Sequence, residues 1–271
     1  MIRSMYSGVT GLQNHQQKLD VIGNNIANVN TFGFKKGRYT FQDMLSQTVQ
    51  GASGSGGDLG GTNPRQIGLG VQTGSIDTIH TQGALQPTGR ELDLGIAGDG
   101  YFRVGPQTGA TDANTLYTRA GNFYLTPVDG EQRYIVNSDG HYLLDEDGNA
   151  IDIPTDAESF SIGSDGGVYV VPSDTDGPHA TIGLATFPNP EGLEKVGGNL
   201  YRPSPNSGAP GDPVTPGEGG SGNLVAGALE MSNVDLSEEF VEMITAQRGL
   251  QANSRIITTS DEVLQELLNL K

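Results

Sequence analysis

The sequence predicts an α+β fold, in which N- and C-terminal helices pair in a coiled coil and an antiparallel all-β domain is inserted between them. Near both ends, apolar residues recur every seven positions, the spacing of helices that pack along a seam. Between the ends, short runs of alternating residues are separated by Asp-Gly pairs, which is typical of tight hairpins. With 271 residues, the chain is long enough to bury a core.

The first helix is expected over about residues 4–28 and is assigned with its flanks to an assembly segment, residues 1–30. Its apolar positions continue from Ile2 and end near Val29. The expected assembly residues are Met5, Val9, Leu12, Leu19, Ile22 and Ile26. Gly8, Gly11 and Gly23 interrupt this helix, each at a cost of about 1 kcal/mol relative to Ala. The segment therefore needs a partner.

The second helix, within residues 236–271, carries a longer seven-residue row and would extend for roughly 50 Å. Ser232, Asn233 or Asp235 can cap its start. Its expected assembly residues are Leu236, Phe240, Met243, Leu250, Ile257 and Leu264. A second row starting at Phe240 continues through Gln247, Ser254 and Asp261, so a two-helix pairing leaves one edge polar and small.

Two interpretations of the helices remain open. They form a simple hairpin on a globular domain, or they are loose in the monomer and fold fully only against neighbouring subunits. Equal helix content in monomer and polymer would exclude the second.

The outer β domain is expected over residues 76–225. Its predicted strands are residues 92–96, 101–104, 122–125, 134–136, 167–171 and 181–187, and its predicted turns are Asp129-Gly130, Asp139-Gly140, Asp147-Gly148 and Asp165-Gly166. A Gly- and Ser-rich stretch, residues 51–57, precedes it, and a Pro- and Gly-rich stretch, residues 203–222, closes it. Residues 31–75 and 226–235 are therefore expected to be extended connecting arms.

Composition excludes several classes of function. The formal charge of −17 opposes binding to nucleic acid or to anionic lipid. Cysteine is absent, which excludes disulfides, thiol catalysis and cysteine metal sites. No segment reads as a signal peptide or a membrane span, so any export is expected to proceed without a cleaved signal.

No enzyme site is predicted, and no catalytic residue, metal ligand or cofactor is assigned. The four histidines are scattered, and His15 is expected in the helix seam. Asp145-Glu-Asp-Gly-Asn149 begins like a calcium loop, but Ala150 stands where the sharp-turn glycine belongs, which favours a hairpin turn.

Long motifs at both ends resemble flagellar rod and hook proteins. Residues 19–38, LDVIGNNIANVNTFGFKKGR, are similar to the N-terminal signature of that family, and residues 230–236 with 243–256 are similar to the C-terminal one. Residues 93–102 and 117–123 are also typical of it. The signature residues are Asp20, Gly23, Asn24, Asn25, Ala27, Asn28, Asn30, Gln247 and Arg248.

The resemblance implies a structural subunit that polymerises into a hollow tube of helically arrayed copies, with the terminal helices on the inside. It implies passage through the flagellar type III export gate and a place in the hook or basal body at the cell exterior. The implied partners are other copies of the chain, rod and hook–filament junction proteins, and the hook cap during growth. Phe41 and Leu45 fit the pattern of the family's export-gate signal; alternatively they are buried in a short amphipathic turn.

Residues 60–64 and 66–71 resemble hook proteins, and Gly-rich arms would let neighbours slide in a joint that bends. The hook is therefore the favoured assignment, and the distal rod, to which the short β insert is closer in size, is the alternative. A more remote alternative is a secreted β-domain adhesin, which leaves the dense terminal motifs unexplained. Arg248 and Arg255, seven residues apart, are expected to form ion pairs between subunits.

Overall fold

The computed structural model describes residues 2–54, 60–106, 114–128, 132–171 and 177–270. The chain divides into two compact units. Unit 1 comprises residues 1–27, 37–78 and 235–271, and unit 2 comprises residues 28–36 and 79–234. The predicted α+β fold with a helix near each end and an antiparallel β region between them is confirmed.

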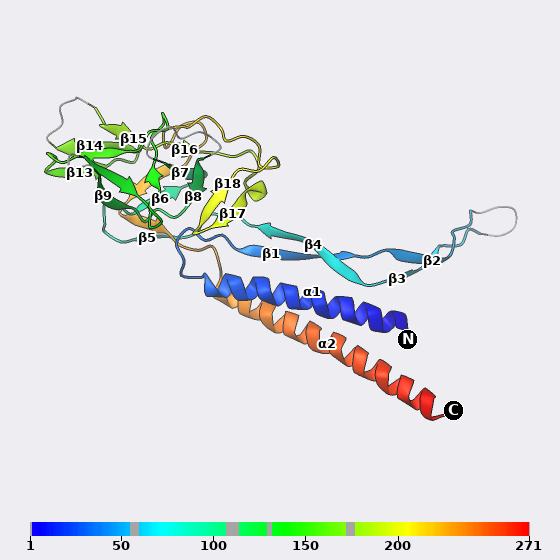
Figure 1. Cartoon of the computed structure of the whole chain (residues 1–271). Coiled ribbons are helices and arrows are strands. Elements are labelled where there is room, and N and C mark those ends of the chain that lie inside the picture. Colours follow the sequence, from blue (N-terminus) through cyan, green and yellow to red (C-terminus); the bar gives the residue numbers. More distant parts are fainter. Residues whose placement is uncertain (1, 55–59, 107–113, 129–131, 172–176, 271) are drawn as a thin grey trace. The chain divides into compact units, whose positions relative to one another are not determined.

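Unit 1 contains both α-helices and two β-ribbons (Figure 1). The helices are α1 (Ile2–Ala27) and α2 (Leu236–Asn269). The strands are β1 (Gly37–Asp43), β2 (Ser46–Gln50), β3 (Arg65–Gly68) and β4 (Val71–Thr78); β1 pairs with β4 and β2 with β3, both antiparallel. Neither described helix is long and apolar enough to cross a membrane.

Asp235 begins α2, as one of the three predicted caps. Its carboxylate accepts hydrogen bonds from the backbone N–H groups of Ser237 at 2.8 Å and Glu238 at 3.4 Å. The acidic residues of the first turn also complement the helix dipole. The capping hydrogen bonds of Asp235 and the acidic first turn therefore fix the start of α2.

The regular secondary structure described in unit 2 consists almost entirely of short antiparallel strands. They are β5 (Leu85–Pro87), β6 (Leu94–Ala97), β7 (Tyr101–Gly105), β8 (Leu116–Thr118), β9 (Tyr124–Val128), β10 (Gln132–Val136), β11 (Tyr142–Leu143), β12 (Asp152–Pro154), β13 (Ser159–Ile162), β14 (Gly167–Val171), β15 (Ala180–Thr181), β16 (Leu184–Ala185), β17 (Glu194–Gly197), β18 (Leu200–Arg202), β19 (Asn223–Ala226) and β20 (Ala228–Glu230), with a 3-10 turn at Pro190–Gly192.

The main sheet of unit 2 has nine strands. Its central order is β12-β10-β11-β7-β8-β18-β17, with β16 paired to β7 and β9 paired to β10. A second sheet has the order β13-β14-β15, and two ribbons pair β19 with β6 and β20 with β5. The larger of two apolar core clusters in this unit includes Leu94, Phe102, Phe123, Ile135, Ile153 and Leu184, and the smaller includes Tyr101, Tyr117 and Tyr201.

Three of the predicted Asp-Gly turns lie among the described residues. Gly140, Gly148 and Gly166 have φ values of 84°, 86° and 77°, a region that glycine enters without steric cost. The fourth predicted turn, Asp129-Gly130, lies outside the described residues. The suspected calcium loop closes as a hairpin, because the Asn149 N–H donates to the Asp145 carboxylate at 2.7 Å.

Candidate assembly interface

The two helices of unit 1 lie antiparallel along a shared seam (Figure 1). The Lys18 ammonium contacts the Glu242 carboxylate at 3.0 Å, and the Asn25 amide donates to Glu239 at 3.1 Å. Because the helices are antiparallel, the C-terminal end of α2 lies near the N-terminal end of α1, and Figure 1 shows α2 extending beyond it. The chain therefore supplies a hairpin of helices from its two ends.

Glycines allow the helices to approach closely. A Cβ on Gly11 would lie 2.7 Å from the Asn253 amide nitrogen, and a Cβ on Gly249 would lie 2.6 Å from the His15 ring. Gly11 therefore lowers the helix propensity of α1, as predicted, but it also allows α2 to pack closely against α1. Gly23 differs, since a Cβ there would meet nothing within 4 Å.

The predicted seven-residue rows fall mainly at the seam. Ile22 is buried, and the half-buried members are Met5, Leu12, Leu19, Ile26, Met243, Leu250, Ile257 and Leu264. Ile257 reaches the surface of α1 at Gly8. His15 also lies at this seam, with its ring 5.2 Å from that of Phe41, and burial followed by the charge of Lys18 lowers its pKa.

The other predicted assembly residues remain exposed in the single chain. Val9, Leu236 and Phe240 are in this group, and Phe240 is half exposed. Further large apolar side chains on the two helices are exposed with them: Tyr6, Val241, Ile244, Ile256, Val263, Leu267, Leu268 and Leu270. The helix hairpin thus partly covers the apolar side chains at the seam and leaves further apolar side chains of both helices exposed.

Asn25, from the N-terminal signature, clamps the chain after the first helix. Its amide nitrogen donates to the Gly37 carbonyl at 2.8 Å, and its amide oxygen accepts from the Gly37 N–H at 2.9 Å. Asn25 and its other partner, Glu239, are both buried. This side chain therefore joins α1, the start of β1 and α2.

A buried hydrogen-bond network attaches the β1–β4 ribbon to α1. The Asn14 amide donates to the Val71 carbonyl at 2.9 Å, and its oxygen accepts from the Tyr39 hydroxyl at 2.6 Å and the Thr73 hydroxyl at 3.1 Å. Tyr39 is itself buried. Residues 37–43 and 71–75 lie within the expected extended connecting arm, and there β-pairing and these side chains hold the backbone against α1.

The β2–β3 ribbon has no such support. Each of its residues is exposed, including the apolar side chains of Val49 and Ile67. A two-stranded ribbon with both faces in water is at best marginally stable. The ribbon is therefore a second surface of unit 1 that lacks cover in the single chain.

Most other signature side chains lie at the surface. Asp20, Gly23, Asn24, Ala27, Asn30, Gln247 and Arg248 are exposed, and Asn28 is half-buried with its amide oxygen accepting from the Thr31 hydroxyl at 3.1 Å. Phe41 and Leu45 are also exposed, so the alternative of a turn that buries both is wrong. Packing within one chain therefore does not account for these residue choices.

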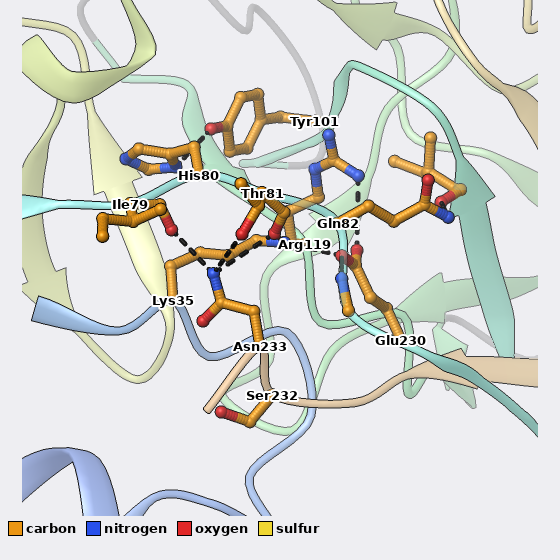
Figure 2. Close-up of polar contacts among 12 residues, drawn as sticks. Lys35, Ile79, His80, Thr81, Gln82, Tyr101, Arg119, Glu230, Ser232 and Asn233 are labelled. Atoms are coloured by element: carbon orange, nitrogen blue, oxygen red, sulfur yellow. Dashed lines mark hydrogen bonds and ion pairs between the residues drawn. The ribbon is translucent and has the colours of Figure 1, made fainter. Parts of the chain in front are cut away.

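Residues of unit 2 that lie within the family-like motifs, but were not singled out in them, meet in a buried polar cluster (Figure 2). The Glu230 carboxylate contacts the Lys35 ammonium at 2.6 Å and the Arg119 guanidinium at 3.2 Å. Asn233 accepts from the Lys36 N–H at 2.8 Å and donates to the Ile79 carbonyl at 2.8 Å. The sequence analysis missed this cluster, and its only signal was the position of these residues within the family motifs.

Aromatic and histidine side chains border this cluster. The Tyr101 hydroxyl lies 2.7 Å from Nδ1 of His80, and the Arg119 guanidinium lies over the Tyr101 ring. Burial, and then the charges of three neighbouring cations, lowers the pKa of His80 to about 4. Burial also raises the pKa of Tyr101 and lowers that of Lys35. Within the described residues, no group of three acidic or histidine side chains could hold a metal ion.

Family models match three parts of the chain. Residues 5–35 match the flagella basal body rod protein model, residues 95–170 match the D1 domain of flagellar hook protein FlgE/F/G, and residues 225–270 match the C-terminal region of flagellar basal body rod FlgEFG protein. The N- and C-terminal matches include Asn25, Lys35 and Glu230.

Curated relatives match over the whole length. The flagellar basal-body rod protein FlgG of Bacillus subtilis is 58% identical over 274 residues, covering all of both chains. FlgG of Agrobacterium fabrum is 39% identical over 97% of each chain. The flagellar hook protein FlgE of Borreliella burgdorferi is 30% identical over an alignment of 447 residues that covers all of both chains.

The motifs, the helix hairpin formed from both ends and these matches all agree. The relatives are flagellar structural components and not enzymes. The chain belongs to the flagellar hook and basal-body rod protein family.

Proposed function

We propose that this chain is the distal-rod subunit of the flagellar basal body, polymerising with its own copies into a rigid, hollow drive shaft. The observation that carries the proposal is the end-to-end match to rod proteins, 58% identical over 274 residues. The hook relatives align over 447 and 468 residues, far more than the 271 residues of this chain. These relatives favour the rod over the hook, which was the favoured assignment from sequence.

The geometry of unit 1 supports a stiff subunit. A hook needs arms that slide, whereas residues 37–43 and 71–78 are paired strands attached to α1 through Asn14 and Tyr39. Asn25 holds the backbone of Gly37 from both sides. A rod that transmits torque without bending requires this kind of fixation.

The uncovered surfaces of unit 1 support the self-association that the family implies. Phe240 and Ile244 are more than one-third exposed on α2, and the β2–β3 ribbon is exposed on both faces. Burying such apolar surface against other copies yields about 25 cal/mol for each Å². Neighbouring copies therefore complete the interface that one chain leaves open.

The remaining partners and the location follow from the rod assignment. The chain passes the flagellar type III export gate, with Phe41 and Leu45 as its candidate signal, and is assembled outside the cytoplasmic membrane. Adjacent rod and hook proteins contact the two ends of the shaft, and the hook cap and hook–filament junction proteins act beyond it.

Localisation in isolated hook–basal bodies tests the assignment. An epitope inserted in residues 55–59, and decorated with antibody, should label the straight shaft. Label on the curved hook would contradict the proposal. A deletion strain adds an independent result: loss of a distal-rod subunit should leave an incomplete rod, whereas loss of a hook subunit should leave a complete rod that bears no hook.

A further inference from the structure

One buried carboxylate in unit 2 serves two buried cations that come from distant parts of the chain. The exposed fractions are 0% for Lys35, 3% for Arg119 and 1% for Glu230. Glu230 is 195 residues after Lys35 and 111 residues after Arg119. We call these three residues the Glu230 cluster; Figure 2 shows the carboxylate between the two cationic side chains.

Glu230 also binds the backbone of two further segments. Its Oε1 accepts from the Gly83 N–H at 2.9 Å, and its carbonyl oxygen accepts from the Gly33 N–H at 2.8 Å. The Lys35 ammonium, held by the same carboxylate, donates to the Thr81 carbonyl at 2.8 Å. Residue 230 therefore joins residues 33–35, 81–83 and 119 at one point.

Removing Glu230 from this point would leave two positive charges buried together. A buried ion that loses its partner retains its desolvation penalty, and two like charges add repulsion. The general loss for a broken buried pair corresponds to an increase of about 100-fold or more in the unfolding equilibrium constant. Water cannot replace the carboxylate cheaply, because all three side chains lie out of solvent.

We infer that Glu230 is a latch that makes closure of unit 2 conditional on the C-terminal segment of that unit. Lys35 and Arg119 precede Glu230 in the chain, so a chain delivered from its N-terminus has both cations in place before their shared anion. Unit 2 stays open until residues 228–233 arrive. Asn233 reinforces the closure by joining Lys36 to Ile79. This inference holds for a rod or a hook subunit.

The latch also predicts how the finished unit opens. Residues 228–233 cannot detach alone, because their departure would leave the cations unpaired. Opening of this segment and of the core is therefore one event. Native-state hydrogen exchange on the full chain can compare the amide of Gly33, bonded to Glu230, with those of Leu94 and Phe123 in the core. In the unaltered chain, the three are expected to share one opening free energy.

A neutral triple variant tests the role of charge. Lys35→Met, Arg119→Met and Glu230→Gln together remove all three charges, and the glutamine oxygen can still accept from Gly83. We expect this variant to fold, because replacing a buried ionic cluster by neutral groups is often neutral or stabilising. Protection of the Gly33 amide should then fall at least about 10-fold below that of the core amides, since the segment can now detach alone.

The single variant Glu230→Gln is the second test. We expect its unfolding equilibrium constant to rise about 100-fold or more, or the chain to lose its fold completely. The matched control is Asp152→Asn, which breaks a partly exposed pair with His179 in the same unit and should change that constant less than about five-fold. The inference is overturned if Glu230→Gln stays within five-fold of the unaltered chain. It is also overturned if the triple variant fails to fold or keeps Gly33 as protected as the core.

Discussion

Replacing Asn25 by alanine removes the clamp that joins α1, β1 and α2. Three hydrogen bonds are lost, two to the backbone of Gly37 and one to the carboxylate of Glu239. Two neutral bonds contribute about 1 kcal/mol each and one bond to a charged group about 1.5–3 kcal/mol, which sums to about 3.5–5 kcal/mol. Because Gly37 is only half-buried, water can recover part of this. We expect a net loss of about 3 kcal/mol.

Urea unfolding of the purified monomer, followed by far-UV circular dichroism, measures this loss. Among the described residues, α-helix is confined to α1 and α2, so the helical signal reports on unit 1. Gln16→Ala is a suitable control, since Gln16 is exposed on the same helix and its removal should change stability by no more than about 0.5 kcal/mol.

A second substitution at the same position separates charge from volume. Asn25→Asp keeps an acceptor for the Gly37 N–H but places a carboxylate against Glu239. It should therefore destabilise the monomer more than alanine does at neutral pH. A loss below about 1 kcal/mol for Asn25→Ala would refute the reasoning, because the clamp would then not hold the three elements together.

Three further predictions concern two exposed helix positions, Gly23 on α1 and Phe240 on α2, and the half-buried His80. Gly23→Ala should stabilise the monomer by up to about 1 kcal/mol in urea unfolding, because a Cβ at this position would have no atom within 4 Å. If neighbouring copies pack against α1 at Gly23, the same substitution should weaken polymerisation, which sedimentation measures. Phe240→Ser should change monomer stability by no more than about 1 kcal/mol, because the side chain is half exposed, yet should abolish tube formation seen by electron microscopy; tubes formed as before would exclude this face from assembly. Folding lowers the pKa of His80 from 6.5 to about 4, so as the pH falls the unfolded chain takes up the proton before the folded chain does. The free energy of unfolding should therefore decline between pH 6.5 and 4, by about 2 kcal/mol after allowance for partial exposure. His80→Gln should flatten this part of the pH profile of urea unfolding, and an unchanged profile would contradict the assignment.

The sequence predicted the elements that follow strong periodicities. The seven-residue rows of apolar residues predicted two long helices, which are α1 and α2. Asp235, which caps α2, was among the expected caps. Alternating runs such as Tyr101–Gly105 became strands, and Asp-Gly pairs such as Asp139-Gly140 became turns with positive φ. Local chemistry decides these features, so a single sequence contains them.

The β-ribbons of unit 1 were missed because glycine and serine nearby dominated the composition. The alternation of Tyr39 with Phe41 and of Val71 with Thr73 was present in the sequence. However, Tyr39 and Thr73 contact α1, through hydrogen bonds to Asn14, which is distant in the chain. Long-range partners of this kind cannot be inferred from local pattern.

Buried charge was missed for a similar reason. Lys35, Arg119 and Glu230 resemble ordinary surface residues in the sequence, since most such side chains are exposed. Only their convergence within unit 2 makes them mutual partners. Gly11 likewise appeared to weaken a helix, whereas its place opposite Asn253 requires the absence of a Cβ.

The central claim is that neighbouring copies cover what one chain leaves open in unit 1. A helical reconstruction of the assembled shaft by electron cryomicroscopy, with side chains resolved, tests it most directly. We predict that Phe240 and Ile244 on α2, and Val49 and Ile67 on the β2–β3 ribbon, lose most of their solvent exposure against adjacent subunits. A shaft in which these four side chains stay exposed to water would contradict the account.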